Sequence, residues 1–111
     1  MELKIEEIKD VVVAKPCVKV IDSDNAKSFK TSLSDVIANN KKIVLDLSGV
    51  TFIDSSGCGT ILACLRKLSA NDGDLKVFGL QKPVRTLFEL VRLHNILDIF
   101  ENKEDAITSF K

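Results

Sequence analysis

The stretch from Lys42 to Leu68, KIVLDLSGVTFIDSSGCGTILACLRKL, decides which fold this sequence predicts. It begins with an apolar run, Ile43 to Leu47, that only Asp46 interrupts. A run so short and so apolar is typical of a strand covered on both faces, as in a parallel sheet that helices enclose. From Cys58 to Leu68 the apolar residues recur at helical spacing instead, so the stretch also predicts a helix.

Between that strand and that helix lies a cluster of turn and capping residues, Asp54-Ser55-Ser56-Gly57. The N–H groups of a helix's first turn lack helical partners and carry partial positive charge, so they can bind a carboxylate or a phosphate. In one interpretation Ser55 or Ser56 caps the helix and Asp54 is only a cap or turn residue. In the other, one serine accepts a phosphate beside an acidic neighbour. These four residues alone favour capping, because short motifs often match by chance.

The wider stretch, VLDLSGVTFIDSSGCGTIL, closely resembles the central motif of the STAS domain, the fold of anti-sigma factor antagonists. In that family an apolar strand leads into Asp-Leu-Ser and then into a short apolar step with an aromatic residue. Asp-Ser-Ser-Gly-x-Gly follows at the start of a helix. Asp46 to Ser48, Phe52 and Asp54 to Gly59 match these parts in turn. The resemblance extends from about Val11 to Phe110.

The resemblance implies an α/β fold, with a single STAS domain over residues 1–111 and a mixed sheet of four or five strands packed with about four helices. It also implies an anti-sigma factor antagonist. In such antagonists the second serine of the pair, here Ser56, is phosphorylated by a serine kinase that is itself the anti-sigma factor. The unphosphorylated chain would bind this kinase and free a sigma factor. A metal-dependent serine phosphatase would restore the active form.

The resemblance further implies that the partner binds around Ser56. The residues expected on that surface are Asp22, Asp54, Ser55, Gly57, Cys58 and Gly59. One segment departs from the family pattern, because antagonists usually carry a glycine where this chain has Lys15 to Lys19. We therefore expect the loop beside the phosphoacceptor to have its own shape.

Two other functions stay open at this point. The same fold serves as a STAS module in lipid-transport systems or stress-signalling complexes, and such a module needs no phosphorylatable serine. A small-ligand-binding regulator, with a nucleotide or a lipid held near the helix start at Ser56, is the second alternative. The oligomeric state is also open.

Composition argues against several other classes of protein. Sixteen basic and sixteen acidic residues balance and are scattered, so we expect no nucleic-acid partner. No apolar run approaches the roughly 20 residues of a membrane helix, and the N-terminus does not resemble a signal peptide. Three cysteines, an odd number without metal-ligand spacing, fit reduced thiols in the cytoplasm. We therefore expect a cytoplasmic protein without a metal or cofactor and without insertion into a membrane.

Catalysis by this chain is not expected. No G-x-S-x-G elbow is present, and His94, the one histidine, is predicted at the surface or at a helix end. Cys58 could be a reactive thiol, since a helix start lowers a thiol pKa. Its place on the apolar stripe with Ile61 and Leu65 favours a buried small hydrophobe instead.

The remaining segments complete an alternation of strands and helices. The second strand is expected to start at Val11 and to continue past Pro16 to Ile21, with Pro16 at an edge or bulge. A turn is expected at Lys9-Asp10, and a helix at Asn25–Ala38 capped by Ser23 or Asp24. A strand at Leu75–Phe78 is followed by a helix that starts at Pro83 and turns Val84, Leu87, Phe88 and Val91 inward. The last expected elements are a strand at Ile96–Phe100 and a final helix with Asn102 and Asp105 as a capping box.

Overall fold

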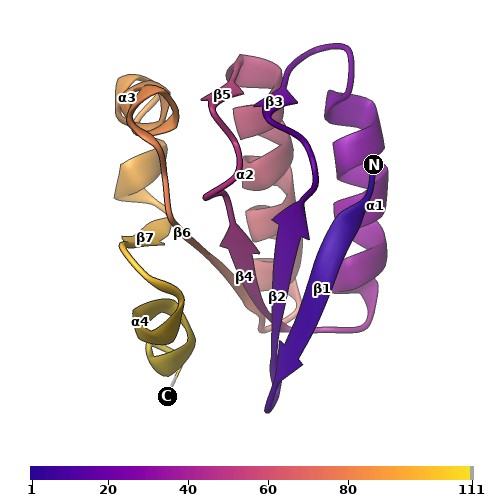
Figure 1. Ribbon diagram of the computed structural model, residues 1–111. Helices are drawn as coiled ribbons and strands as arrows, with labels where there is room; N and C mark the ends of the chain where they lie inside the picture. Colours follow the sequence, from indigo (N-terminus) through magenta and orange to yellow (C-terminus); the bar gives the residue numbers. More distant parts are fainter. Residues whose placement is uncertain (111) are drawn as a thin grey trace.

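A mixed sheet runs through the middle of the protein, as the computed structural model of residues 1–110 shows (Figure 1). Its five strands stand in the order β1-β2-β4-β6-β7. They are β1 (Leu3–Ile8), β2 (Val11–Pro16), β4 (Lys42–Asp46), β6 (Asp74–Phe78) and β7 (Asp98–Phe100). The first pair is antiparallel and the other neighbours are parallel. Lys111, the last residue of the predicted domain, lies outside the described residues.

Helices cover both faces of this sheet. They are α1 (Ala26–Ala38), α2 (Ser55–Ala70), α3 (Lys82–Leu90) and α4 (Lys103–Thr108), with the short 3-10 helix η1 (Leu93–Asn95) after α3. The helices α1, α2 and α3 contribute to the larger apolar core, whereas α4 packs with a smaller cluster on the opposite face. The predicted α/β fold, a mixed sheet of four or five strands packed with about four helices, is confirmed: the described residues form a five-stranded sheet and four α-helices, with a separate two-stranded pair of β3 (Val20–Ile21) and β5 (Phe52–Ile53). In residues 1–110, no helix has the length and apolar character to cross a membrane.

Strand β4 explains why the stretch from Lys42 onward organises the fold. Ile43 and Leu45 face the larger core, Val44 faces the smaller cluster, and all three are fully buried. A strand with neighbours on both sides and cover on both faces needs this continuous apolar run. The prediction of a buried strand is confirmed.

The second strand is shorter than the sequence predicts. It ends at Pro16, and Val20 and Ile21 form a separate strand, β3 (Val20–Ile21), which pairs in parallel with β5 (Phe52–Ile53). Pro16 cannot donate a hydrogen bond, and the pairing of β2 with β4 stops at Ala14. From Lys19 on, the chain bonds instead to the segment before β5, because the carbonyl of Lys19 accepts from the backbone N–H of Thr51.

The start of α1 differs from its prediction, whereas the start of α4 agrees with it. Asn25, rather than Ser23 or Asp24, is the residue before α1, and no side chain caps that helix. The Asn25 side chain bonds backwards, accepting from the N–H of Asp22 at 2.9 Å. The predicted cap of α4 by Asn102 is confirmed, since Asn102 Oδ1 accepts from the N–H of Asp105 at 2.9 Å. The second bond of the pair joins the two side chains, because Asn102 Nδ2 donates to Asp105 Oδ2 at 3.2 Å.

Candidate functional site

Asp54 forms the start of α2. Its extended backbone places the carboxylate over the first turn, where Oδ1 accepts from the N–H of Ser56 at 2.9 Å and of Gly57 at 3.1 Å. Its other oxygen accepts from the N–H of Ser23 at 3.1 Å and so ties the segment after β3 to the helix. The cap of α2 is therefore the aspartate and neither serine. A carboxylate is an especially good cap because its charge suits the positive end of the helix.

The Ser56 hydroxyl therefore does not cap the helix. Its Oγ donates to Asp54 Oδ1 at 2.5 Å, and the side chain is half-buried. The hydroxyl of Ser56 and the N–H groups of Gly57, Ser56 and Ser23 hold the pKa of the Asp54 carboxyl below its ordinary value. At neutral pH Asp54 is therefore ionised, and a carboxylate faces the hydroxyl proton of Ser56.

Gly57 fixes where this serine stands. A Cβ on Gly57 would lie 2.5 Å from Cγ1 of Ile53 and 2.9 Å from Cγ2 of Ile21. Real Cβ atoms do not approach so closely, so only glycine lets α2 begin in contact with the β3–β5 pair. The residue itself is buried, and its role in the structure is to set the position of its neighbour Ser56.

The other predicted site residues gather at the same helix start. Ser55 and Gly59 are exposed, and a Cβ on Gly59 would have no atom within 4 Å. Asp22 is half-buried beside Ser23, and its Oδ1 accepts from the N–H of Asp24 at 3.0 Å. All of them lie near Ser56, but their predicted contact with a partner stays a prediction.

Cys58 is buried on the inner side of α2. Burial, together with the negative charge of Asp54, raises the pKa of its thiol to about 11. This confirms the interpretation as a small core hydrophobe. His94 is exposed in η1, as predicted. Among residues 1–110, no three His, Cys, Asp or Glu side chains come together in a way that could hold a metal ion.

Sequence reasoning missed an apolar surface next to the helix start. A shallow groove of about 210 Å³ is lined by Ser55, Cys58, Gly59, Leu62, Val91, Leu93 and Ile96. Val91 was expected to face inward but follows the last residue of α3 and is 44% exposed, and Ile96 is 56% exposed. The sequence offers no signal for this, because an apolar residue at a helix end matches the pattern of a core residue equally well.

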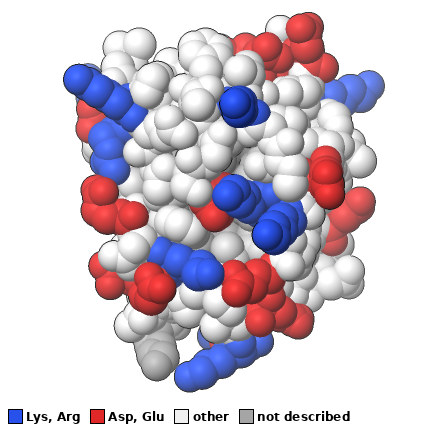
Figure 2. Space-filling view, in the orientation of Figure 1, with Lys and Arg blue, Asp and Glu red and all other residues white. Residues whose placement is uncertain are grey.

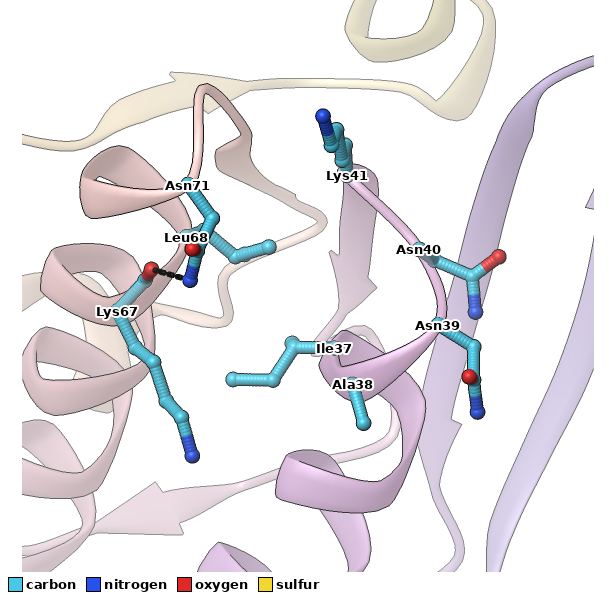
Figure 3. Close-up of a pocket in the computed structure, with 8 residues that line it drawn as sticks. All are labelled: Ile37, Ala38, Asn39, Asn40, Lys41, Lys67, Leu68 and Asn71. Atoms are coloured by element: carbon cyan, nitrogen blue, oxygen red, sulfur yellow. Dashed lines mark hydrogen bonds between the residues drawn. The ribbon is translucent and has the colours of Figure 1, made fainter.

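The opposite end of α2 holds a different hollow (Figure 3). About 470 Å³ in volume, it lies between the C-terminal ends of α1 and α2, and Asn71 closes one side by donating to the carbonyl of Lys67 at 3.0 Å. By the rise of an α-helix it is about 20 Å from Ser56. The two features therefore have no residue in common.

Charged side chains are mixed over the face seen in Figure 2, where lysines and arginines alternate with acidic residues. Elsewhere in the described residues opposite charges also pair, for example Lys103 with Glu6 at 2.9 Å and Lys42 with Asp10 at 2.6 Å. That face therefore carries no large patch of one sign.

Comparison with known proteins identifies the family. The STAS domain model matches residues 2–106. The chain belongs to the STAS domain family. Across all of its length it is 28% identical to BtrV of Bordetella bronchiseptica, a candidate anti-sigma factor antagonist, and 24% identical to the anti-sigma F factor antagonist of Paenibacillus polymyxa. It covers 96% of each of these relatives.

A solved structure has the same fold. The Bacillus cell fate determinant SpoIIAA in its phosphorylated form superposes with a TM-score of 0.71, at 21% identity, over 99% of this chain and 100% of that one. The expected STAS architecture is thus confirmed both by the family model and by structural likeness.

Proposed function

We propose that this STAS domain is an anti-sigma factor antagonist whose binding is switched by phosphorylation of Ser56. The unphosphorylated chain binds an anti-sigma factor that is also a serine kinase, and so frees a sigma factor. The kinase then phosphorylates Ser56, and a metal-dependent serine phosphatase reverses the step. In this proposal the chain is a substrate and a binding module that acts in the cytoplasm and has no catalytic role.

One observation carries the proposal: the hydroxyl of Ser56 donates to the ionised carboxylate of Asp54 at 2.5 Å at the start of α2. The γ-phosphoryl group of ATP would pass to Ser56 Oγ while the hydroxyl proton leaves toward that carboxylate, and ADP would depart. The new phosphate would lie at the positive end of α2, which favours it. The site thus suits both the acceptor and its product.

The same geometry supports a switch. A phosphate brings about −1.5 to −2 charges to Ser56 and replaces the hydroxyl proton that now joins it to Asp54. Two like-charged groups would then face each other at the helix start. A partner that fits the neutral hydroxyl and the apolar groove beside it would meet a dianion instead, and it would dissociate.

The relatives support the identity of the partner. Both BtrV and the Paenibacillus protein carry names that refer to anti-sigma factor antagonists, and each aligns over the full length of this chain. SpoIIAA, which has the same fold, has been solved in a phosphorylated form. An anti-sigma factor is therefore the partner class to test first.

The decisive experiment combines phosphopeptide mass spectrometry with a binding assay. The chain is purified from its native cells with and without stress, and we expect a phosphate on Ser56 whose occupancy changes with the condition. Ser56→Ala should stay bound to an ATP-binding kinase, and Ser56→Asp should lose it. Ser55→Ala, an exposed neighbour in the same turn, is the matched control and should bind like the wild type.

Two outcomes would contradict the proposal. If Ser56→Ala and Ser56→Asp bind the kinase as the wild type does, Ser56 is not the switch. If Ser56 carries no phosphate in any condition and transporter subunits co-purify in place of a kinase, the chain is a constitutive STAS module of a lipid-transport or stress-signalling complex.

A further inference from the structure

The sequence Asp-x-Ser-Gly occurs twice in the chain, at Asp46–Gly49 and at Asp54–Gly57. The structure gives both copies the same hydrogen bonds. Asp46 Oδ1 accepts from the N–H of Ser48 at 2.9 Å and from its hydroxyl at 2.6 Å. Asp54 Oδ1 accepts from the N–H of Ser56 at 2.9 Å and from its hydroxyl at 2.5 Å.

Ser48 is the more accessible of the two serines. It follows the end of β4 and is exposed, whereas Ser56 is half-buried. Its backbone is held from two sides: the side-chain amide of Gln81 donates to the carbonyl of Ser48 at 2.8 Å, and a Cβ on Gly79 would lie 3.0 Å from the Ser48 Cβ. The backbone of this turn is therefore held in place, while Ser48 itself is open to solvent.

A lysine lies beside this turn. A Cβ on Gly49, the next residue, would be 3.4 Å from Cε of Lys15 and 4.0 Å from its Nζ. Lys15 makes no ion pair with any residue in the described part of the chain. With Asp46, it is among the residues that line a hollow of about 390 Å³ on the sheet face opposite α1 and α2.

We propose that Ser48 is a second phosphoacceptor, modified by an ATP-dependent serine kinase. An exposed hydroxyl held by a carboxylate within hydrogen-bond reach has the arrangement of an activated nucleophile. Ser48 Oγ attacks the γ-phosphorus of ATP, the O–P bond to ADP breaks, and the hydroxyl proton passes to Asp46. The ammonium of Lys15 then pairs with the new phosphate.

This modification would differ from that of Ser56 in its surroundings. A phosphate on Ser56 would lie at the start of α2 beside Asp54, next to the apolar groove. The phosphate on Ser48 would join the loop after β4 to Lys15 of β2. The site rests on its own contacts, so it stands even if Ser56 proves not to be modified.

The test uses the full chain, tagged and expressed in its native cells, as wild type, Ser48→Ala, Ser56→Ala and the double variant. Trypsin releases Ser48 and Ser56 in one peptide, Ile43 to Arg66. Fragment ions from cleavage between Gly49 and Thr51 assign a phosphate to Ser48, and cleavage between Ser55 and Ser56 assigns one to Ser56. We expect Ser56→Ala to retain a phosphate on Ser48 and the double variant to lose all phosphate from this peptide. Ser48→Thr, which keeps a hydroxyl, should restore a phosphate at position 48.

Asp46→Asn gives a matched control, because its amide oxygen still accepts the same two hydrogen bonds but takes no proton. We expect several-fold less phosphate on Ser48 in this variant and an unchanged level on Ser56. A phosphate on Ser56 with none on Ser48 in any condition overturns this inference and leaves the proposed function intact. A phosphate on Ser48 alone supports this inference and overturns the proposed switch at Ser56. The absence of phosphate from both serines overturns this inference and the proposed function.

Discussion

Gly57 lies so close to Ile53 that a methyl group on the glycine would stand 2.5 Å from Cγ1 of that side chain. Ile53 is fully buried, so it has little room to move away. This contact brings the first turn of α2 against the β3–β5 pair and thereby sets the position of Ser56. The glycine of the motif thus acts through packing, one residue away from the hydroxyl of the proposed phosphoacceptor.

Substituting the two glycines of the motif should therefore have opposite effects. Gly57→Ala is expected to lower the free energy of unfolding by about 1–3 kcal/mol, since it overpacks a closed site. Gly59→Ala, with open space around its Cβ position, should raise it by up to about 1 kcal/mol through helix propensity. Urea unfolding of both variants measures this. Equal stabilities would show that the contact with Ile53 relaxes freely.

The cap formed by Asp54 should give a pH-dependent contribution to stability. Because the folded-state pKa of Asp54 is lowered from 3.8, its contribution is fully present above pH 3.8 and is lost as the pH falls through the lower folded-state value. The difference in unfolding free energy between wild type and Asp54→Asn should therefore shrink across that acidic window. A difference that stays constant or grows on acidification would contradict the assignment.

The three thiols should react in a fixed order. Cys17 is exposed, whereas Cys58 and Cys64 are buried and burial raises the pKa of both thiols. At neutral pH iodoacetamide should label the native protein at Cys17, and the other two should react only after unfolding. Cys17→Ser should abolish native labelling. Fast labelling of Cys58 in the native protein would indicate a reactive thiol at the helix start.

Lys76 should stabilise the contact of α4 with the sheet mainly through its carbon chain. Its Nζ lies 2.8 Å from Asp98 Oδ2 and 5.0 Å from the ring centre of Phe110, and the side chain is 8% exposed. Burial alone would lower the pKa of Lys76, yet the carboxylates of Asp98 and Asp74 outweigh it and raise that pKa. Asp98 is exposed and Asp74 is about half exposed, and contact with water weakens both ion pairs.

We therefore expect Lys76→Ala to cost about 2–3 kcal/mol of unfolding free energy, because it removes the stem that packs beneath α4. Lys76→Met keeps that stem and should stay within about 1 kcal/mol of the wild type. Hydrogen exchange in α4 should rise in the alanine variant. If the methionine variant is as unstable as the alanine variant, the charge matters more than the packing.

Features with a local cause were predictable from the sequence. The apolar run at Ile43 to Leu47 predicts β4, the change to helical spacing after Gly57 predicts α2, and Asn102 with Asp105 predicts the start of α4. Each depends on residues within a few positions of one another. Burial on both faces, helix periodicity and capping are all encoded at that range.

Features that depend on a distant partner were not predictable in the same way. The strand β3 exists because β5 pairs with it, and no residue near Pro16 predicts that pairing. The choice of Asp54 over the serines as cap depends on how the chain enters α2 from β5 and on the bond from Ser23. The apolar pattern of α3 extends to Val91, but the helix ends at Leu90, and Val91 is therefore exposed.

The sequence by itself determined the family, the order of the main elements and the serine pair at the start of α2, because these follow from short-range patterns. Only the tertiary structure decided which hydroxyl is held by a carboxylate and which glycine the packing requires. It also decided that the Asp46–Ser48 turn repeats the geometry of Asp54–Ser56 and has Lys15 beside it. Those relationships join residues from different strands and helices, and their distances are set by the packed sheet.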